Sequence, residues 1–273
     1  MTFAAHTDAV QHHPTRSAFA RQCPFDEAKP ISGPRRLRSR MRLPAIVLNF
    51  KTYPEILGKK GWDLAKRFAA ISDETGASIV LCPPATDIAH VAKLVHVPVF
   101  AQHVDAVEPG QTTGWSPPEA LLEAGAAGTL INHSERKVAW EEMAKSIPRC
   151  QKLGLEVVAC ADDLAEAETL AKFSPEYIAI EPPELIGGDV SVTTAKPEVV
   201  SRAVDRIQAV NPKIVVLCGA GVRTRKDVAR ALELGTSGVL LATGIVKAKD
   251  PEGALRDLIR GLPSGAPRRS KSR

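Results

Sequence analysis

The sequence predicts an α/β fold in which eight parallel strands, alternating with helices, close into a single-domain (β/α)₈ barrel. Two observations lead to this prediction. Short runs of Val, Ile, Leu and Ala alternate with longer stretches of helical periodicity, and each run is continuously apolar, as in parallel strands covered on both faces. Eight such units in about 220 residues match the size of a (β/α)₈ barrel, with a doubly wound open sheet as the main alternative.

The eight predicted strands follow one another along the chain. In order they are Ala45–Leu48, Ser78–Cys82, Pro98–Ala101, Thr129–Asn132, Glu156–Ala161, Tyr177–Ile180, Lys213–Cys218 and Gly238–Ala242. Helix signals lie between them. The segment Trp62–Glu74 ends before Gly76, and Arg225–Leu234 ends at Gly235, because glycine readily adopts the left-handed conformation that stops a helix. Ser116, followed by two prolines, is expected to cap another helix.

The charge of the chain is unevenly distributed. The composition, 44% hydrophobic and 25% charged, is that of an ordinary globular protein, and the formal net charge is +5. Residues 1–42 carry +5 and residues 264–273 carry +4, which leaves −4 for residues 43–263. A mildly acidic body argues against nucleic-acid binding. We therefore predict a barrel domain at 43–263 between basic, disordered tails at 1–42 and 264–273.

Targeting and redox signals favour a cytoplasmic protein without cofactors. No apolar stretch reaches the ~18 residues that span a bilayer, so no membrane segment is predicted. Residues 1–42 also fit a transit peptide in their Arg-rich composition, or a start codon assigned too early. The chain has five cysteines without CxxC spacing, and Cys82, Cys160 and Cys218 fall in strand-like runs, where buried thiols are expected. This usage fits a reducing compartment. Neither a metal nor an organic cofactor is predicted, because no His/Asp/Glu cluster has ligand spacing.

Polar residues follow the ends of the predicted strands, and in a barrel the carboxyl ends of all strands share one rim. They are Asn49 and Lys51 after the first strand, Gln102 and His103 after the third, His133, Ser134 and Glu135 after the fourth, and Glu181 after the sixth. Small residues follow the last two strands, namely Gly219-Ala220-Gly221 and Ala242-Thr243-Gly244. The sequence thus predicts charged groups opposite a glycine-lined pocket.

Glu181 is the strongest candidate for a general base. It stands where a strand ends and a proline- and glycine-containing loop begins, so a rigidly held carboxylate would lie under a mobile lid that excludes water. Lys51 would supply a fixed positive charge for an anionic substrate. His133 precedes a helix that we expect to begin near Ser134 to Arg136, and the dipole of that helix would favour a neutral imidazole.

Together these motifs resemble those of the triosephosphate isomerase family, in the shorter form typical of archaea and some bacteria. The motifs are Asn49-x-Lys51, Asn132-His133-Ser134-Glu135, Glu181 to Gly187, and Cys218-Gly219-Ala220-Gly221-Val222. The similarity extends from about Leu43 to Gly261. The resemblance implies a TIM barrel and interconversion of glyceraldehyde 3-phosphate and dihydroxyacetone phosphate.

The resemblance also implies a role for each residue. Glu181 would shuttle a proton between adjacent carbons, and His133 would act as the electrophile on the substrate oxygens. Lys51, with Asn49 beside it, would bind the anionic enediolate. Glu135 would not contact the substrate but would hold the cationic site together as a partner of its residues. The phosphate would receive N–H groups from Gly187, Gly221, Ala242 and Thr243, the kind of donors that main-chain turns supply.

The lid departs from the family pattern. Members usually have Gly-Thr-Gly after the isoleucine, whereas this chain has Gly187-Gly188-Asp189. An aspartate near a phosphate is unfavourable if it points inward. Two alternatives therefore stay open at this point: an isomerase acting on a four-carbon ketose phosphate (a tetrulose phosphate), and a non-catalytic phosphosugar-binding barrel.

The third strand is followed by a long polar loop, Val104–Trp115. It resembles the loop that family members insert into a neighbouring subunit beside its active site, with Thr113 and Trp115 near its end. The resemblance implies a homodimer or homotetramer. The alternative is an exposed functional loop on a monomer.

Overall fold

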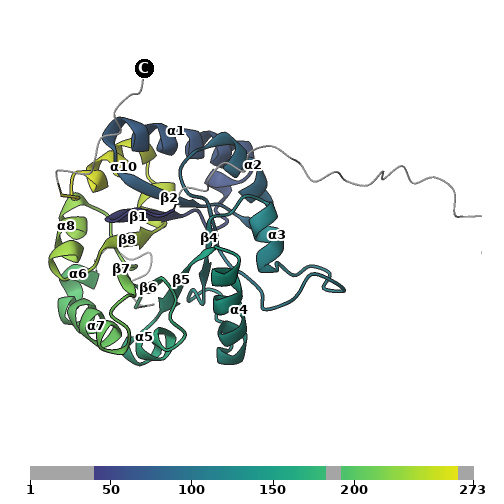
Figure 1. The fold of residues 1–273 in the computed structure, drawn as a ribbon. Helices are drawn as coiled ribbons and strands as arrows, with labels where there is room; N and C mark the ends of the chain where they lie inside the picture. The colour runs from purple at the N-terminus through teal and green to yellow at the C-terminus, as the bar shows by residue number, and fades with distance from the viewer. Residues whose placement is uncertain (1–39, 183–191, 264–273) are drawn as a thin grey trace, which may run out of the picture. The chain divides into compact units, whose positions relative to one another are not determined.

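The computed structural model describes residues 40–182 and 192–263, and these residues form a barrel of eight parallel strands surrounded by helices (Figure 1). The predicted fold class is confirmed. The strands are β1 Ala45–Asn49, β2 Ser78–Cys82, β3 Phe100–Ala101, β4 Gly128–Ile131, β5 Glu156–Ala161, β6 Tyr177–Ile180, β7 Val215–Cys218 and β8 Gly238–Leu241.

The sheet closes on itself, which decides between the barrel and the open-sheet alternative. Its strands pair in the order β2-β1-β8-β7-β6-β5-β4-β3. The remaining seam is bridged where the Leu81 N–H donates to the Pro98 carbonyl at 3.0 Å, next to a parallel bridge between Leu81 and Val99. β3 is two residues shorter than predicted, because Pro98 has no N–H to donate and Val99 makes an isolated bridge.

Helices ring the outside of the barrel (Figure 1). They are α1 Lys59–Thr75, α2 Ile88–Leu94, α3 Pro118–Glu123, α4 Trp140–Lys152, α5 Leu164–Ala171, α6 Val192–Ala195, α7 Pro197–Val210, α8 Arg225–Glu233, α9 Thr243–Val246 and α10 Pro251–Ile259, with short 3₁₀ turns at Pro54–Ile56 and Ala85–Asp87. Gly76 ends α1 in the left-handed conformation, as predicted.

The expected Ser116 cap on α3 is wrong. Pro117 occupies the cap position of that helix, and its carbonyl accepts the N–H groups of Ala120 and Leu121. Ser116 is used elsewhere: its N–H donates to Asp105 Oδ2 at 2.7 Å, and its carbonyl accepts the Asp105 N–H at 3.0 Å. These two hydrogen bonds close the base of the long loop between β3 and α3.

Successive strand residues alternate between two apolar clusters. On β1, Ala45 and Val47 belong to the cluster inside the barrel, whereas Ile46 and Leu48 pack with the surrounding helices. Both faces of the strands are therefore buried, which explains their continuously apolar sequences. With the barrel filled by side chains, open space for a ligand lies at its ends rather than along its axis.

The amino-terminal end of the barrel is closed by a buried polar cluster. Met41 lies in the inner apolar cluster, and its N–H donates to Glu156 Oε2 at 2.9 Å. The Tyr177 hydroxyl donates to Glu156 Oε1 at 3.0 Å. Burial raises the pKa of Glu156 above its usual value. This arrangement seals one end of the barrel and leaves the rim predicted above at the other.

In the described part of the chain, no helix is long and apolar enough to cross a bilayer. Over the same ranges, no three His, Cys, Asp or Glu side chains are grouped so that they could hold a metal ion. The thiols of Cys82, Cys150, Cys160 and Cys218 are buried and unbridged.

The predicted division of the chain leads to a truncation test. All eight strands lie within residues 40–263, so removing residues 1–39 and 264–273 is expected to leave the melting temperature and the activity nearly unchanged. Differential scanning calorimetry of the full chain and of the 40–263 fragment measures this. A clearly lower melting temperature of the fragment would show that a terminal segment stabilises the barrel.

Candidate active site

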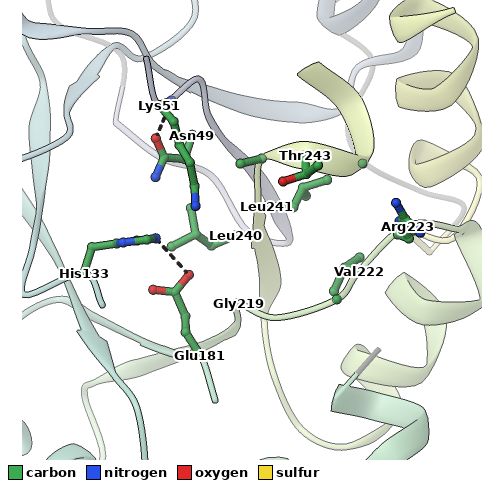
Figure 2. Close-up of a pocket in the computed structure, with 13 residues that line it drawn as sticks. Asn49, Lys51, His133, Glu181, Gly219, Val222, Arg223, Leu240, Leu241 and Thr243 are labelled. Carbon is green, nitrogen blue, oxygen red and sulfur yellow. Dashed lines mark hydrogen bonds and ion pairs between the residues drawn. The ribbon is translucent and has the colours of Figure 1, made fainter. Parts of the chain in front are cut away.

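The carboxyl ends of the strands border a pocket that brings most of the predicted residues together (Figure 2). The pocket holds about 440 Å³ of empty space, including its opening to solvent. Its lining includes Asn49, Lys51, His133, Glu181, Gly219, Gly221, Ala242, Thr243 and Gly244. Glu135 lies against Lys51 on the neighbouring wall. Gly187, like Gly188 and Asp189, lies outside the described residues.

Glu181 is a carboxylate held away from water. It follows β6, its N–H donates to the Ala161 carbonyl at 2.8 Å, and only 2% of its surface is exposed. Among the described residues, no side chain or backbone group donates a hydrogen bond to its Oε2. Burial raises the pKa of Glu181 to about 7, against opposing effects of the Cys160 thiol and the Lys51 charge. A carboxylate with such a pKa accepts protons effectively near neutral pH.

Gly219 provides the space that Glu181 occupies. A methyl group at position 219 would lie 2.2 Å from Glu181 Cγ and 3.0 Å from its Oε1. The Gly219 N–H donates to the Ile180 carbonyl at 2.9 Å, so the two backbones run side by side. The absence of a side chain at 219 therefore sets where the glutamate can lie.

His133 faces Glu181 as a neutral ring with a defined tautomer. Its Nδ1 accepts the Glu135 N–H at 3.1 Å, so in the neutral form the proton is on Nε2. Nε2 lies 3.8 Å from Glu181 Oε1 (Figure 2). Burial lowers the pKa of His133, and the nearby Lys51 charge lowers it further. The imidazole can therefore donate one hydrogen bond into the pocket.

The expected helix after His133 is not there. Residues 134–136 form a turn, in which the Arg136 N–H donates to the His133 carbonyl at 2.8 Å, and α4 begins only at Trp140. A helix dipole therefore does not explain the neutral imidazole. Desolvation and Lys51 do so instead.

Lys51 sits on a strained turn. Its φ of 52° is unusual for a residue with a side chain, and its N–H donates to Asn49 Oδ1 at 2.9 Å. Gln102 Nε2 donates to the carbonyls of Lys51 and Cys82, both at 2.9 Å. Lys51 Nζ pairs with Glu135 Oε1 at 2.6 Å. Side-chain amides thus hold the turn that places the ammonium group in the pocket.

A second strained turn places His133. Asn132 has a φ of 62°, and its Nδ2 donates to the Cys160 carbonyl at 2.9 Å and to Glu166 Oε1 at 2.8 Å. Lys137 Nζ also contacts Glu166 Oε2, at 2.8 Å. The loop that carries His133 is therefore tied to β5 and to α5.

The opposite wall of the pocket consists mainly of backbone. Gly221 has a φ of 69°, and α9 begins at Thr243 after Ala242. Inside α9 the Ile245 N–H donates to the Ala242 carbonyl at 3.1 Å, so the N–H groups of Thr243 and Gly244 precede the hydrogen bonds of the helix. Such a turn suits an anion.

Two residues at this side of the pocket, Tyr53 and Arg223, were not among the predicted site residues. The Tyr53 hydroxyl lies 3.1 Å from Thr243 Oγ1 and so connects the loop after β1 with the turn after β8. Arg223 lines the pocket directly after the Cys218–Val222 motif. No sequence motif predicts the Tyr53–Thr243 contact. The place of Arg223 directly after the glycine-containing motif is a signal that could have predicted its position at the pocket.

Comparisons with known proteins agree on one family. The family model described as triosephosphate isomerase matches residues 44–261. The triosephosphate isomerase of Methanosarcina barkeri is 46% identical over 220 residues, which cover 81% of this chain and 99% of the relative. That of Methanobacterium bryantii is 45% identical over 216 residues, or 79% and 96% of the two chains. That of Methanocaldococcus jannaschii is 44% identical over 215 residues, or 79% and 98%.

The contact between positions 219 and 181 leads to a substitution test. In Gly219→Ala the new methyl group displaces the glutamate, and kcat/KM is expected to fall by about 10²-fold or more, because displacement of a reacting group by 1 Å can have that effect. Gly110→Ala is the matched control, since nothing lies within 4 Å of the added methyl group there. Equal kcat/KM values for the two variants would contradict the assignment.

The raised pKa of Glu181 leads to a stability test. Since its folded-state pKa of about 7 exceeds the ordinary 4.5, the folded protein binds this proton more tightly than the unfolded chain, and stability is lost as pH rises from 4.5 through 7. Glu181→Gln does not ionise. The free energy of unfolding of Glu181→Gln minus that of the parent is therefore expected to be about 3 kcal/mol larger (more positive) at pH 8 than at pH 4.5.

Urea unfolding of both proteins at the two pH values measures this difference. Glu123→Gln, at an exposed position of α3, is the control for the loss of a carboxyl group as such. A Glu181→Gln difference that is the same at pH 4.5 and pH 8 would mean that burial does not perturb this carboxyl group.

Proposed function

Because this chain belongs to the triosephosphate isomerase family, we propose that it interconverts glyceraldehyde 3-phosphate and dihydroxyacetone phosphate. The observation that carries this proposal is that the buried Glu181, whose Oε2 has no hydrogen-bond partner among the described residues, faces the protonated Nε2 of a neutral His133, 3.8 Å from its Oε1, in one pocket. The reaction is a proton transfer through an enediolate, and no cofactor takes part in it.

Glu181 removes a proton from one carbon of the bound triose and returns it to the adjacent carbon. It can do so because its pKa near 7 lets it exist as a carboxylate at neutral pH and still hold the proton once transferred. The carbon acid gains negative charge on the neighbouring oxygen during this step. That charge has to be stabilised by polar groups that face Glu181 across the pocket.

His133 and Lys51 provide this stabilisation. The Nε2–H of His133 donates to the substrate oxygen that becomes negative, and a neutral imidazole can later exchange a proton between the two oxygens. Lys51 is 10% exposed at its side chain, so its positive charge acts in a largely dry site, where charges interact more strongly. Asn49 and Glu135 hold Lys51 through its N–H and its ammonium group.

The phosphate group binds on the backbone wall of the pocket. Gly221, Ala242 and Thr243 supply N–H groups there, and we propose that Gly187 adds another from the lid. Anchoring the phosphate places the two reacting carbons between Glu181 and His133.

We further propose that the protein is a homodimer or homotetramer. The loop Val104–Trp115 stands away from the barrel between β3 and α3, and 52% of Trp115 is exposed. Its base is fixed by the hydrogen bonds between Asp105 and Ser116, so its tip can be presented to a neighbouring subunit (Figure 1). Four unbridged thiols suit a cytoplasmic location.

One assay tests the proposed activity and its base together. The purified protein is expected to isomerise glyceraldehyde 3-phosphate in preference to tetrulose phosphates. Glu181→Gln should lose about 10²- to 10⁴-fold or more in kcat, the usual contribution of a positioned base, while still binding substrate. The control is Glu123→Gln, on the exposed face of α3. Preferential turnover of a tetrulose phosphate, or full activity of Glu181→Gln, would refute the proposal.

A companion variant tests the fixed charge. Lys51→Ala removes the cation and leaves Glu135 without its partner, so kcat/KM is expected to fall by about 10²-fold or more, the loss typical of removing one preorganised electrostatic group. Its circular dichroism spectrum should remain that of the parent. Near-native kcat/KM would show that the developing negative charge is stabilised elsewhere.

A further inference from the structure

The short helix α9 borders the catalytic pocket but is too short to be stable by itself. It spans Thr243–Val246, a single turn, and Thr243 and Gly244 line the pocket (Figure 2). Forming one helical turn costs more conformational entropy than its few hydrogen bonds return, so a helix of this length is held by contacts with other segments. Ile245 and Val246, in its second half, are buried in the apolar cluster that includes the surrounding helices. The part that borders the pocket needs contacts of its own.

Tyr53 contacts α9 at both ends. Its hydroxyl lies 3.1 Å from Thr243 Oγ1, at the first residue of the helix. Lys247 caps the other end, and its ammonium nitrogen lies 5.0 Å from the centroid of the Tyr53 ring, within the range of a cation–π interaction. Tyr53 is not itself one of the described residues that line the pocket. Its side chain therefore acts on the helix and not on a bound ligand.

Tyr53 is in turn held by the segment that follows it. It precedes the 3₁₀ turn Pro54–Ile56, and its carbonyl accepts the Ile56 N–H at 3.0 Å. Ile56 is fully buried. A methyl group on Gly61 of α1 would collide with the Ile56 carbonyl oxygen, so the turn and this helix are in close contact. The tyrosine ring thus extends from a backbone that is packed against α1.

The turn at Lys51, two residues before Tyr53, is held by different groups. The Lys51 N–H donates to Asn49 Oδ1, and its carbonyl accepts Gln102 Nε2, each at 2.9 Å. Neither hydrogen bond involves Tyr53 or α9. Loss of the contact between Tyr53 and Thr243 should therefore affect α9 and leave the ammonium group of Lys51 in place.

We propose that Tyr53 is a positioning residue for the phosphate-binding part of the site: through Thr243, its hydroxyl holds α9 where the substrate phosphate binds. The inference rests on the proposed function, which assigns the phosphate to this wall of the pocket. The contribution of the hydroxyl is that of one neutral hydrogen bond, because the contact of the ring with Lys247 remains when the hydroxyl is removed.

The test compares Tyr53→Phe with Tyr177→Phe, since the chain has two tyrosines. Each substitution removes one hydroxyl hydrogen bond, but that of Tyr177 goes to Glu156 at the opposite end of the barrel. Tyr53→Phe is expected to weaken the Kd of inorganic phosphate, measured by calorimetry, by about 2- to 10-fold. It should raise KM for glyceraldehyde 3-phosphate by a similar factor, with kcat nearly unchanged. Tyr177→Phe should change neither constant.

Two further measurements separate positioning of α9 from a general disturbance of the site. In a Thr243→Val background, Tyr53→Phe should weaken phosphate binding no further, because the hydroxyl has already lost its partner. Unphosphorylated glyceraldehyde should be turned over equally by Tyr53→Phe and the parent, since it has no group that binds at α9.

Three results would overturn the inference: equal phosphate affinities of Tyr53→Phe and Tyr177→Phe, additive effects of the substitutions at positions 53 and 243, or an equal loss of turnover with both substrates. A different result would count against the proposed reaction instead. In that case the phosphate affinity depends on Tyr53 as expected, but the parent protein does not isomerise glyceraldehyde 3-phosphate.

Discussion

The site depends on keeping the carboxyl group of Glu181 away from water. A carboxylate buried to 2% exposure costs folding free energy whenever it is ionised, so the surrounding structure has to hold it in place against that cost. The same burial makes Glu181 suitable as a base, because it raises the pKa of the carboxyl group to about 7. Gly219 leaves the space for the group, and the hydrogen-bonded ends of β5 and β6 fix its backbone.

The side chains that face Glu181 are placed by two turns with strained backbone, and hydrogen bonds from side-chain amides offset the cost of that strain. Lys51 and Asn132 both have positive φ, at a cost of about 1–3 kcal/mol each for residues other than glycine. Asn49 and Gln102 secure the first turn, and the amide of Asn132 itself secures the second. Because these amides also bond to neighbouring strands, the closed barrel determines the distance between the imidazole and the base.

The sequence predicts the barrel well because its strands are buried on both faces and hence continuously apolar. Three of them, β2, β5 and β6, have the predicted bounds, whereas β3 is cut short by Pro98 and β4 ends before Asn132 turns left-handed. The apolar pattern that marks strands and helices does not register a missing N–H, a left-handed residue or a short-range side-chain hydrogen bond. The helix expected at Ser134 was wrong for this reason: the Glu135 N–H bonds to the His133 ring, two residues away, instead of starting a helix.

The site is predictable in part. The positions of Asn49, Lys51, His133 and Glu181 at strand ends follow from the barrel topology, and the structure places all four in one pocket. The sequence does not show what sets the pKa of His133, which is lowered by burial and then by Lys51. Nor does it show that Gly219 leaves the space for the Glu181 side chain. Contacts between distant segments, such as Tyr53 with Thr243, have no local signature.

The most direct measurement of the central claim is a carbon-13 NMR titration of the Glu181 side-chain carboxyl group in the substrate-free protein. The resonance can be assigned by its absence from Glu181→Gln. If burial tunes this group for proton transfer, its chemical shift should titrate with a pKa of about 7, well above the ordinary 4.5. Titration near 4.5 would contradict the account, because the carboxyl group would then be hydrated and the geometry described here would not explain its basicity.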